Sequence, residues 1–410
     1  MDIFVDDDAV AQTHTIATPS DLPALLVELN ANFTGVTFDT DANDYLTIQN
    51  LSLMHTRDSG SGVYINGSEY ITVDSCTLSY NYWCGSNAAG NPHGYTTISN
   101  NTIEYNGAYG IRSARTNQSG HDLVTLNEIS NNCFREDQVV LGIGGGFIDS
   151  TISYNTLYDN GPGGVGYATL NDAMSFDIAD GSTIDIHHNT MYGNTGGAGI
   201  WLEGNGNIHH NLSYENEAGI RVGWVTTVKD VVVNIYYNIC YGNNKGISQG
   251  GNTAGTFALN IYNNVLYDNT LSAPASSEEI NLWNNVTTLV MKNNILSGTA
   301  SNHNEFSAVT QTGATIDYNL YQYGTKYYNS VNRNWATWQG YGFDANGINT
   351  TDPLMTDPSN GDFTLQFGSR CINFGISVGL YLDYLGLPVP IGHRPDIGAY
   401  EHKNGSNAIW

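Results

Sequence analysis

The chain has 410 residues, with 13 Lys and Arg against 39 Asp and Glu, and a formal net charge of −26. Thirteen basic residues are too few for the positively charged stripe that binds nucleic acid, so we expect no nucleic-acid partner. A hydrophobic content of 40% and an aromatic content of 11% are sufficient for a buried core, which argues against disorder. No run of about 18 apolar residues occurs, so the sequence predicts no membrane span.

The chain opens on Met1 and an acidic segment without a signal peptide, so Met1 looks like a start placed before a mature segment. The acidic composition, rich in Asn, Gly and Thr, fits a secreted protein, and we expect an extracellular location. The five cysteines form an odd number and lack metal-ligand spacing. At least one must therefore stay free, and Cys76 and Cys240, which fall at core-facing positions of the repeat described below, are interpreted as small buried hydrophobic residues.

Residues 1–43 are predicted to form an N-terminal cap, because the first coil of a parallel structure would otherwise expose unpaired strand edges. Within it, the segment 20–29 has the Ser-Asp-x-Pro start and apolar run of a short capped helix. Asp39, Asp41 and Asn43 have the spacing of a calcium loop, but the central glycine and the bidentate glutamate of such a loop are missing. We expect turn acids here; no metal site or cofactor is firmly implied, and Ca²⁺ stays an alternative.

Residues 44–325 repeat one pattern, in which Ile-x-x-Asn is followed by a second Asn five residues after the first. The clear copies are Ile98-Asn101-Asn106, Val124-Asn127-Asn132, Ile152-Asn155-Asn160, Ile186-Asn189-Asn194, Ile208-Asn211-Asn216, Ile235-Asn238-Asn243 and Ile261-Asn264-Asn269. Weaker copies surround Asn81, Asn294 and Asn319. A unit of about 25 residues with short alternating strands cannot bury its apolar face alone, whereas stacked units bury it continuously.

The stacking of these units predicts an asparagine ladder. Asparagine tolerates the left-handed backbone of a sharp corner, and strands about 4.8 Å apart allow the amides of successive coils to hydrogen-bond. The positions two residues after the first Asn point inward: Ile103, Ile129, Leu157, Met191, Cys240, Leu266 and Leu296. The predicted fold is therefore an all-β, right-handed parallel β-helix of about ten coils, followed by a C-terminal cap over residues 326–410.

One strand of each coil follows the second Asn and a Gly, and its side chains alternate between the core and the surface. The residues that this alternation points outward on one face are Arg112, Trp201, Glu203 and Arg221. The longest coil adds Tyr167, Asp172 and a strand over residues 176–178. If the flanking apolar residues point inward, Asp177 points outward, one coil away from Glu203.

Asp177 and Glu203 are the candidate catalytic pair. Neighbouring strand positions are about 4.8 Å apart and diagonal positions a few ångströms more, which covers the carboxylate separations of retaining (about 5 Å) and inverting (about 6.5–9.5 Å) glycosidases. Two carboxylates this close repel each other, so one tends to keep its proton and can act as the acid while the other acts as the base. The alternative is a solvated face on which the two charges meet by coincidence.

Five further residues are candidates for substrate binding: Arg112, Arg115, Tyr167, Trp201 and Arg221. The arginines would bind carboxylate or sulfate groups, and the indole would stack on a sugar face.

Two columns of side chains have a structural interpretation and a functional alternative. His187 and His188, and then His209 and His210, precede successive ladder asparagines; stacked corner histidines are favoured over a metal site or a catalytic base. Tyrosines stand three residues after consecutive asparagines, at Tyr158, Tyr192, Tyr214, Tyr241 and Tyr267. They predict a stabilising stack, with a sugar platform or a subunit contact as alternatives, so a monomer and a homotrimer both stay open.

The coils and the ending Arg-Pro-Asp-Ile-Gly-Ala-Tyr-Glu (residues 394–401) resemble secreted right-handed β-helix proteins of the pectate-lyase-like superfamily, over nearly the whole chain. In that superfamily substrates lie on the strand that carries Arg112. The pattern is also similar to disaggregatase-type enzymes, which digest the chondroitin-like matrix of archaeal aggregates. The segments 91–94 and 119–122, with His93, resemble parts of β-helix uronate epimerases, but Asn91 and Gly94 replace the acids that flank the epimerase histidine.

The superfamily contains lyases, hydrolases, epimerases, esterases and adhesins, so the resemblance implies a fold more than a reaction. We expect an extracellular, endo-acting hydrolase of an acidic polysaccharide that contains uronate or hexosamine and is chondroitin-like. A polysaccharide lyase or uronate C5-epimerase, and a non-catalytic glycan-binding adhesin, are the alternatives. The acid-rich and base-poor composition favours the hydrolase, because a lyase needs a cation to neutralise the uronate carboxylate.

Overall fold

The computed structural model describes the strands within residues 2–34 and most of residues 37–403. The gaps in the second range are 58–59, 91–92, 115–119, 134–140, 162–170, 180, 195, 224–229, 251–254, 271–277, 283–285, 299–302, 307–308, 310, 323–324, 329–330 and 350. The chain divides into two compact units, Met1–Asn205 and Gly206–Trp410.

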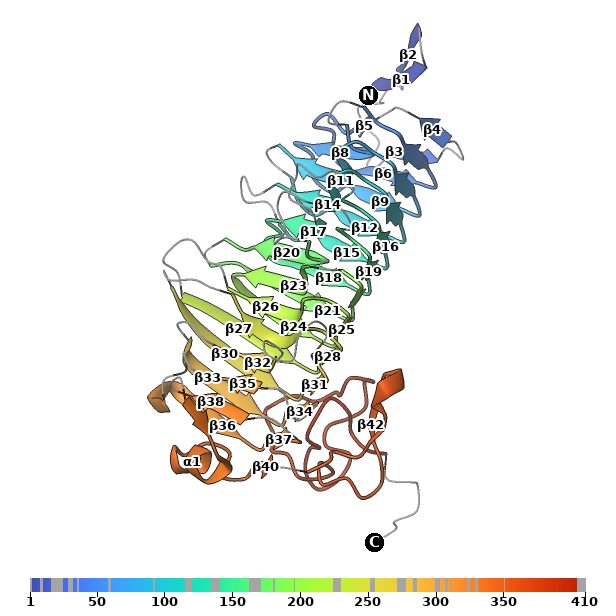
Figure 1. The fold of residues 1–410 in the computed structure, drawn as a ribbon. Coiled ribbons are helices and arrows are strands. Elements are labelled where there is room, and N and C mark those ends of the chain that lie inside the picture. Colours follow the sequence, from blue (N-terminus) through green and yellow to red (C-terminus); the bar gives the residue numbers. More distant parts are fainter. Residues whose placement is uncertain are drawn as a thin grey trace. The chain divides into compact units, whose positions relative to one another are not determined.

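The first unit is built from three parallel sheets, and each coil contributes one strand to each of them (Figure 1). Sheet A contains β3 (Leu25–Glu28), β6 (Leu46–Gln49), β9 (Thr72–Asp74), β12 (Thr97–Ser99), β15 (Leu123–Thr125), β18 (Ser150–Ser153) and β21 (Thr183–His187). Sheet B contains β4 (Asn32–Thr34), β7 (Ser52–Met54), β10 (Thr77–Ser79), β13 (Thr102–Glu104), β16 (Glu128–Ser130), β19 (Thr156–Tyr158) and β22 (Thr190–Tyr192). Sheet C contains β5 (Phe38–Asp39), β8 (Val63–Asn66), β11 (Cys84–Ala89), β14 (Tyr109–Ser113), β17 (Leu141–Gly145), β20 (Met174–Asp177) and β23 (Ala198–Glu203). The predicted parallel β-helix is confirmed.

The predicted N-terminal helix is wrong where the structure describes its segment. Residues Leu25–Glu28 form β3, which pairs in parallel with β6, with Leu25 opposite Leu46 and Val27 opposite Ile48. An isolated helix of this length is marginal in water, whereas a strand satisfies the hydrogen-bonding groups along the edge of β6. A separate antiparallel pair, β1 (Asp2–Asp7) and β2 (Val10–Thr15), precedes it. Parallel pairing therefore begins before the predicted boundary at residue 44.

The asparagine ladders of the first unit are present and fully buried. Asn127 is 2% exposed, and its Oδ1 accepts hydrogen bonds from the backbone N and from Nδ2 of Asn101 at 3.0 and 2.9 Å. The Nδ2 of Asn127 in turn donates to Asn155 Oδ1 at 2.9 Å. A second ladder runs through Asn81, Asn106, Asn132, Asn160 and Asn194. Each amide thus forms hydrogen bonds to the corresponding asparagines of the neighbouring coils, which links successive corners.

The left-handed residue of each corner is not the ladder asparagine, contrary to the sequence expectation. The residue before it has the positive φ, as at Leu126 (58°) and Tyr154 (56°). The asparagine itself must keep a backbone that directs its amide along the stack, so the turn is made one position earlier. Stacked aromatic side chains occupy several of these left-handed positions; the rings of Tyr80 and Tyr105, for example, are stacked with centroids 5.0 Å apart.

The predicted inward positions are confirmed as the core. Ile103, Ile129, Leu157 and Met191 are 0% exposed. All five cysteines of the chain are buried and free. The glycine before the sheet C strand has a packing reason: a Cβ on Gly110 would lie 2.6 Å from the carbonyl oxygen of the next coil, so no side chain fits there.

The second unit repeats the three-sheet arrangement. Sheet D contains β24 (Asn205–His209), β27 (Asp230–Tyr236), β30 (Thr256–Tyr262), β33 (Val286–Lys292) and β36 (Ala314–Asp317). Sheet E contains β25 (Leu212–Tyr214), β28 (Ile239–Tyr241), β31 (Val265–Tyr267), β34 (Ile295–Ser297), β37 (Leu320–Tyr321) and β40 (Ile348–Asn349). Sheet F contains β26 (Ala218–Val222), β29 (Lys245–Gln249), β32 (Glu278–Asn281), β35 (His303–Glu305), β38 (Thr325–Tyr328) and the antiparallel β39 (Val331–Arg333). Parallel pairing continues to β40, beyond the predicted boundary at residue 325.

Carboxylates end both ladders of the second unit. Asn319 Nδ2 donates to Asp344 Oδ1 at 3.0 Å, and Asn269 Nδ2 donates to Glu279 Oε2 at 2.5 Å. Asp344 is fully buried and also accepts a hydrogen bond from the indole of Trp338 at 2.9 Å. Trp338 lies on α1 (Trp335–Gly340). Each carboxylate supplies the acceptor that a further ladder asparagine would otherwise provide.

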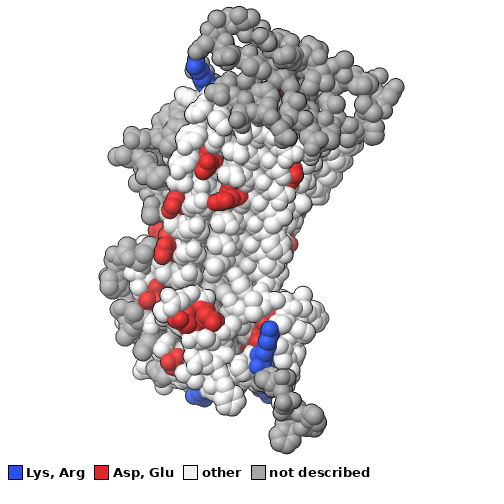
Figure 2. All heavy atoms as spheres, turned by 90° about the vertical axis from the view of Figure 1, so that its right-hand side faces the viewer, with Lys and Arg blue, Asp and Glu red and all other residues white. Residues whose placement is uncertain are grey.

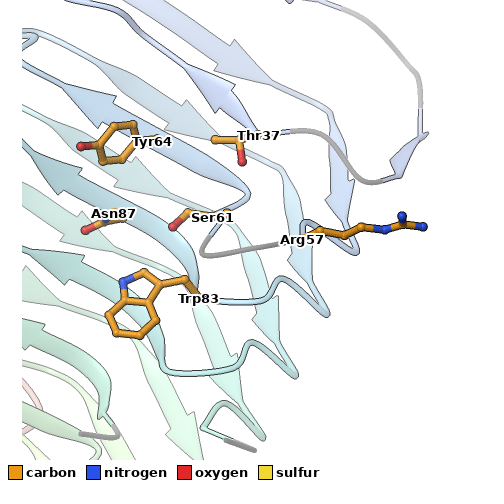
Figure 3. Close-up of a pocket in the computed structure, with 7 residues that line it drawn as sticks. Thr37, Arg57, Ser61, Tyr64, Trp83 and Asn87 are labelled. Atoms are coloured by element: carbon orange, nitrogen blue, oxygen red, sulfur yellow. The ribbon is translucent and has the colours of Figure 1, made fainter. Parts of the chain in front are cut away.

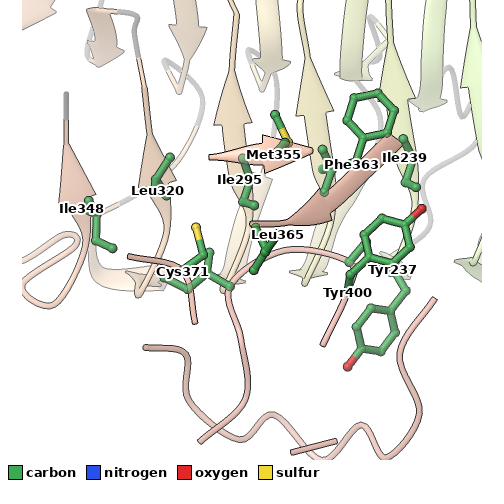
Figure 4. Close-up of a cluster of buried hydrophobic side chains, with 13 residues drawn as sticks. Tyr237, Ile239, Ile295, Leu320, Ile348, Met355, Phe363, Leu365, Cys371 and Tyr400 are labelled. Carbon is green, nitrogen blue, oxygen red and sulfur yellow. The ribbon is translucent and has the colours of Figure 1, made fainter. Parts of the chain in front are cut away.

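The C-terminal residues cover a face of sheet E (Figure 4). Side chains from β41 (Met355–Asp357), β42 (Asp362–Leu365) and the following loops pack against Ile239, Val265, Ile295, Leu320 and Ile348 of that sheet. Corner residues hold the same segment: Asn263 Nδ2 donates to the carbonyl of Gly398 at 3.0 Å, and Asn293 Nδ2 to that of Ile376 at 2.8 Å. Among the described residues, no helix is long and apolar enough to cross a membrane.

The closing motif is held by three buried carboxylates. Asp383 accepts the backbone N–H groups of Leu385 and Leu387, and Asp396 Oδ1 accepts that of Asn373 at 2.6 Å. Glu401 accepts the N–H groups of Ile391 and Asp396 at 2.9 and 2.8 Å. These bonds pair backbone N–H groups in a segment that is mostly loop and has few strand partners. The motif at residues 394–401 therefore has a structural role.

We expect the second unit to lose stability as the pH rises from about 4.5 to about 7. Burial, with smaller repulsion from Asp396 and Asp383, raises the pKa of Glu401 from 4.5 to about 7, and burial also raises the pKa of Asp383 and Asp396. The folded state binds these protons more tightly than the unfolded chain does. The stabilisation that the three groups provide is therefore complete below their pKa in the unfolded chain, and it is lost as the pH rises through their pKa in the folded protein. Thermal unfolding followed by circular dichroism between pH 4.5 and 8 measures the effect. Glu401→Gln should flatten this dependence, and a melting temperature that rises over the same range would contradict it.

Candidate functional site

One row of in-register positions runs across the outer face of sheet C. It passes through Tyr64, Asn87, Arg112, Gly144, Ser175 and Trp201, each the direct partner of the next. Alternation produces this row, because the residues on either side of Tyr64, Val63 and Ile65, are 0% exposed. The structure therefore brings Arg112 and Trp201 to one face of the first unit, as predicted.

Asp177 and Glu203 lie side by side at the ends of β20 and β23. They are direct partners in the parallel register, and both side chains are partly exposed. Their neighbours Phe176 and Leu202 are 0% exposed, which is why the two carboxylates point outward. Direct partners on adjacent strands are about 4.8 Å apart along the backbone, so the two side chains leave the same side of the sheet from neighbouring strands.

Trp201 is placed beside this pair but is mostly covered. It is 5% exposed, and its row neighbour Ser175 is 8% exposed. Only a small part of the indole is open to a ligand. Its predicted role in sugar stacking stays a prediction.

Arg112 lies three strands from Trp201 in the same row. Its Nη1 donates to Asn87 Oδ1 at 3.0 Å, and its guanidinium lies 5.8 Å from the ring centroid of Tyr109. These contacts hold a partly exposed cation on the face of sheet C, where it can meet an anionic group.

The other predicted site residues are placed as follows. Arg115 and Tyr167 lie outside the described residues. Arg221 belongs to the second unit, on β26, where it pairs with Glu217. Asp172 is 0% exposed and accepts the backbone N–H of Ala198 at 2.6 Å, which makes it a structural residue.

The sequence reasoning missed a cavity at the N-terminal end of sheet C. It has a volume of about 580 Å³ and is lined by Thr37, Arg57, Gly60, Ser61, Tyr64, Trp83 and Asn87. Figure 3 shows Tyr64, Asn87 and Trp83 gathered on one side, with Ser61 and Thr37 beside them, whereas the side chain of Arg57 extends away. The sequence does carry a signal for this cavity, which is a longer connection in one coil. Val63 lies seven positions after Thr56, whereas their partners in the next coil, Asn81 and Ser86, are five positions apart.

A second acidic group lies on sheet F and was also missed. Glu278 Oε2 is 3.7 Å from Lys245 Nζ, and Asn281 Nδ2 donates to Glu278. Burial raises the pKa of Glu278, and the charge of Glu305 acts in the same direction. Perturbed carboxyl groups of this kind occur at functional sites and in structural ion pairs alike.

The corner histidines have structural partners. His188 stacks on Tyr154 with ring centroids 4.7 Å apart, and His210 Nε2 lies 3.0 Å from the carbonyl oxygen of Asp383. His93 is 2% exposed, and its Nδ1 lies 2.9 Å from the carbonyl oxygen of Gly90. These contacts favour the structural interpretation of all three histidines.

The predicted tyrosine column is stacked within each unit. The rings of Tyr158 and Tyr192 have centroids 5.1 Å apart, and those of Tyr214 and Tyr241 are 4.9 Å apart. In the second unit Phe363 of the C-terminal segment lies against the column, 5.1 Å from Tyr241. That part of the column is covered by the chain itself.

The spacing that resembled a calcium loop forms a turn. Asp39 Oδ1 accepts the backbone N–H of Asp41 at 2.9 Å, and Asn43 Nδ2 donates to the carbonyl of Thr40 at 2.8 Å. Within the part of the chain that the structure describes, no three His, Cys, Asp or Glu side chains are gathered as a metal site.

On the face shown in Figure 2, the negative charge is thinly spread. On the face in Figure 2, acidic side chains are scattered over a mostly uncharged surface, and basic side chains are few. Only 13% of the residues are charged. A single arginine on a functional face can therefore change the local potential appreciably.

Comparison with known proteins identifies the fold. A family model described as "Right handed beta helix region" matches residues 29–177. The A-module of the Azotobacter vinelandii mannuronan C-5 epimerase AlgE6 is similar with a TM-score of 0.56 and 14% identity, over 78% of this chain and 89% of that one. Pectate lyase Pel9A is similar with a TM-score of 0.50 and 14% identity, over 92% and 86%. XylC in complex with xylose is similar with a TM-score of 0.50 and 12% identity, over 88% and 65%. No curated protein sequence matches the chain.

Proposed function

We propose that this protein is a secreted, endo-acting polysaccharide hydrolase that uses Asp177 and Glu203 as its carboxylate pair. The direct register of these two residues on the outer face of sheet C carries the proposal. The structural neighbours support it at the level of substrate class, since their names include a pectate lyase and a mannuronan epimerase, which act on polysaccharides.

The pair performs hydrolysis through general acid and base chemistry. One carboxyl group acts as the general acid and gives a proton to the glycosidic oxygen as the bond breaks. The other carboxylate either activates a water molecule or attacks the anomeric carbon, depending on the separation of the two groups. Neighbouring strand positions about 4.8 Å apart favour the short separation used by retaining enzymes.

The proposed substrate is an acidic polysaccharide of the chondroitin-like type, with uronate or hexosamine units. Arg112 supports this choice, because it places a partly exposed cation on the same face as the carboxylate pair. An acidic polymer approaching a chain of net charge −26 is repelled overall, so its binding should depend on such local cations and should weaken with salt.

A polysaccharide lyase is the second candidate, favoured by the same observation. Arg112 could neutralise a uronate carboxylate and so make the C5 proton more acidic, which is the task of a cation in β-elimination. A non-catalytic glycan-binding protein is the third, since the fold by itself does not require a reaction.

Product analysis separates these three candidates. The purified protein is incubated with chondroitin, polygalacturonate and xylan, with and without EDTA and added Ca²⁺. A hydrolase increases reducing ends without absorbance near 230 nm, a lyase produces that absorbance from a 4,5-unsaturated uronate, and a binding protein produces neither. Mass spectrometry of the products identifies the linkage and shows whether cleavage is internal.

A further inference from the structure

We propose that the cavity lined by Ser61, Tyr64, Trp83 and Asn87 binds one sugar unit of the substrate polymer, at a distance from the carboxylate pair. The ligand class is a hexose or N-acetylhexosamine ring held by one aromatic face and by neutral hydrogen-bonding groups. The inference deepens the proposed function and rests on it for the idea that one polymer chain reaches both places.

The cavity arises from a local departure from the repeat. Thr56 takes the place of a ladder asparagine, and its backbone N–H donates to Asn81 Oδ1. Its hydroxyl donates to the carbonyl of Gly60 at 2.6 Å, and the same carbonyl accepts the N–H of Trp83 at 3.0 Å. Gly60 is therefore held against both the corner and the backbone of Trp83 in the next coil.

The lining has the composition of a sugar-binding site. Trp83 and Tyr64 supply aromatic surface, and aromatic rings offer large apolar faces at low entropic cost. Asn87 Oδ1 is already bonded to Arg112 Nη1 at 3.0 Å, which leaves the Nδ2 donors of this amide for a ligand. The volume of about 580 Å³ lies within the range of small-molecule sites.

The side chains around the cavity are mainly neutral. Arg57 extends away from Tyr64, Asn87 and Trp83 (Figure 3), and the guanidinium of Arg112 is engaged on the far side of Asn87. A neutral or N-acetylated ring therefore fits the cavity better than a free carboxylate. Arg112 lies one strand beyond and is placed to meet an anionic group on the next sugar.

The cavity and the carboxylate pair share sheet C. Asn87 is on β11, and Asp177 and Glu203 are on β20 and β23, three and four strands further along the sheet. At about 4.8 Å per strand, the separation along the sheet is about 14–19 Å. A short oligosaccharide cannot occupy both places, whereas a longer one can. Binding affinity and kcat/KM should therefore increase with the length of the oligosaccharide.

The test uses Trp83→Ala and Trp83→Phe, with Tyr105→Ala as a matched control. Tyr105 is a partly exposed aromatic residue of the same unit, stacked on Tyr80 at a corner away from the cavity. Calorimetry measures the binding of tetra- and octasaccharides of chondroitin to the Asp177→Asn/Glu203→Gln protein. Near-ultraviolet circular dichroism of each variant checks that the fold is retained.

Trp83→Ala should weaken octasaccharide binding about tenfold or more, Trp83→Phe should weaken it less, and Tyr105→Ala should leave it unchanged. The ratio of kcat/KM between octa- and tetrasaccharide should fall in Trp83→Ala. If Trp83→Ala binds the octasaccharide as tightly as the unsubstituted protein, or if no glycan binds at millimolar concentration, the cavity proposal is overturned. If Trp83 is required for binding but the wild-type protein cleaves no glycan, the cavity stands and the proposed hydrolase function fails.

Discussion

Replacing Glu203 by Gln, or Asp177 by Asn, is expected to lower the rate of polysaccharide cleavage by about 10²–10⁴-fold. Each substitution keeps the size of the side chain but removes a group that gives or takes a proton. The two residues are direct partners on β20 and β23, so removing either should disable the same step and the double variant should be little worse than the single ones. Reducing-end assays on the polymer that gives products measure the loss.

Two matched substitutions make this experiment decisive. Glu128→Gln removes an exposed acid of sheet B, where Glu128 accepts a hydrogen bond from Tyr158, and should leave cleavage unchanged. Glu278→Gln removes the acid with the raised pKa on sheet F. If this variant loses cleavage while the variants of Asp177 and Glu203 retain it, the catalytic centre lies in the second unit and our assignment is wrong.

Replacing Asn127 by Ala is expected to destabilise the first unit by several kcal/mol. The side chain accepts two hydrogen bonds from Asn101 and donates to the carbonyls of Ile98 and Thr125 and to Asn155 Oδ1. Its removal leaves several buried groups unpaired, at about 1–3 kcal/mol for each. Such a sum is comparable with the whole stability of many domains, so we expect low soluble yield or a large drop in the unfolding midpoint.

Leu126, the residue before Asn127, provides a control substitution that should not lower the stability. Leu126 is 55% exposed and has a φ of 58°, a conformation that costs a leucine about 1–2 kcal/mol. Leu126→Asn should therefore be neutral or stabilising, because asparagine tolerates this conformation. Chemical unfolding of both variants, followed by circular dichroism, compares them. Equal destabilisation by the two substitutions would contradict the ladder as the source of corner stability.

Much of the fold follows from residue spacing, and the exceptions have clear physical causes. The repeated asparagines and the apolar positions after them predict the coils and the core, as the 0% exposed Ile103 and Leu157 show. The helix expected near residue 25 is instead strand β3, because the edge of β6 offers hydrogen bonds that a local sequence pattern does not reveal. The left-handed corner residue is one position earlier than expected, because the ladder amide must point along the stack.

The sequence by itself determined the parallel coils, an asparagine ladder and the neighbouring positions of Asp177 and Glu203. These features depend on alternation within a strand and on a repeat that sets the register between strands, and both are periodic. Only the tertiary structure decided that Trp201 is 5% exposed, that the C-terminal segment covers sheet E, and that Tyr64, Trp83 and Asn87 line a cavity. Burial and cavities depend on side chains and loops from several coils together, which no single repeat specifies. The net charge of −26 indicates that an acidic substrate needs a local positive charge in order to bind. The structure identifies Arg112 on sheet C as a cation that can supply this charge.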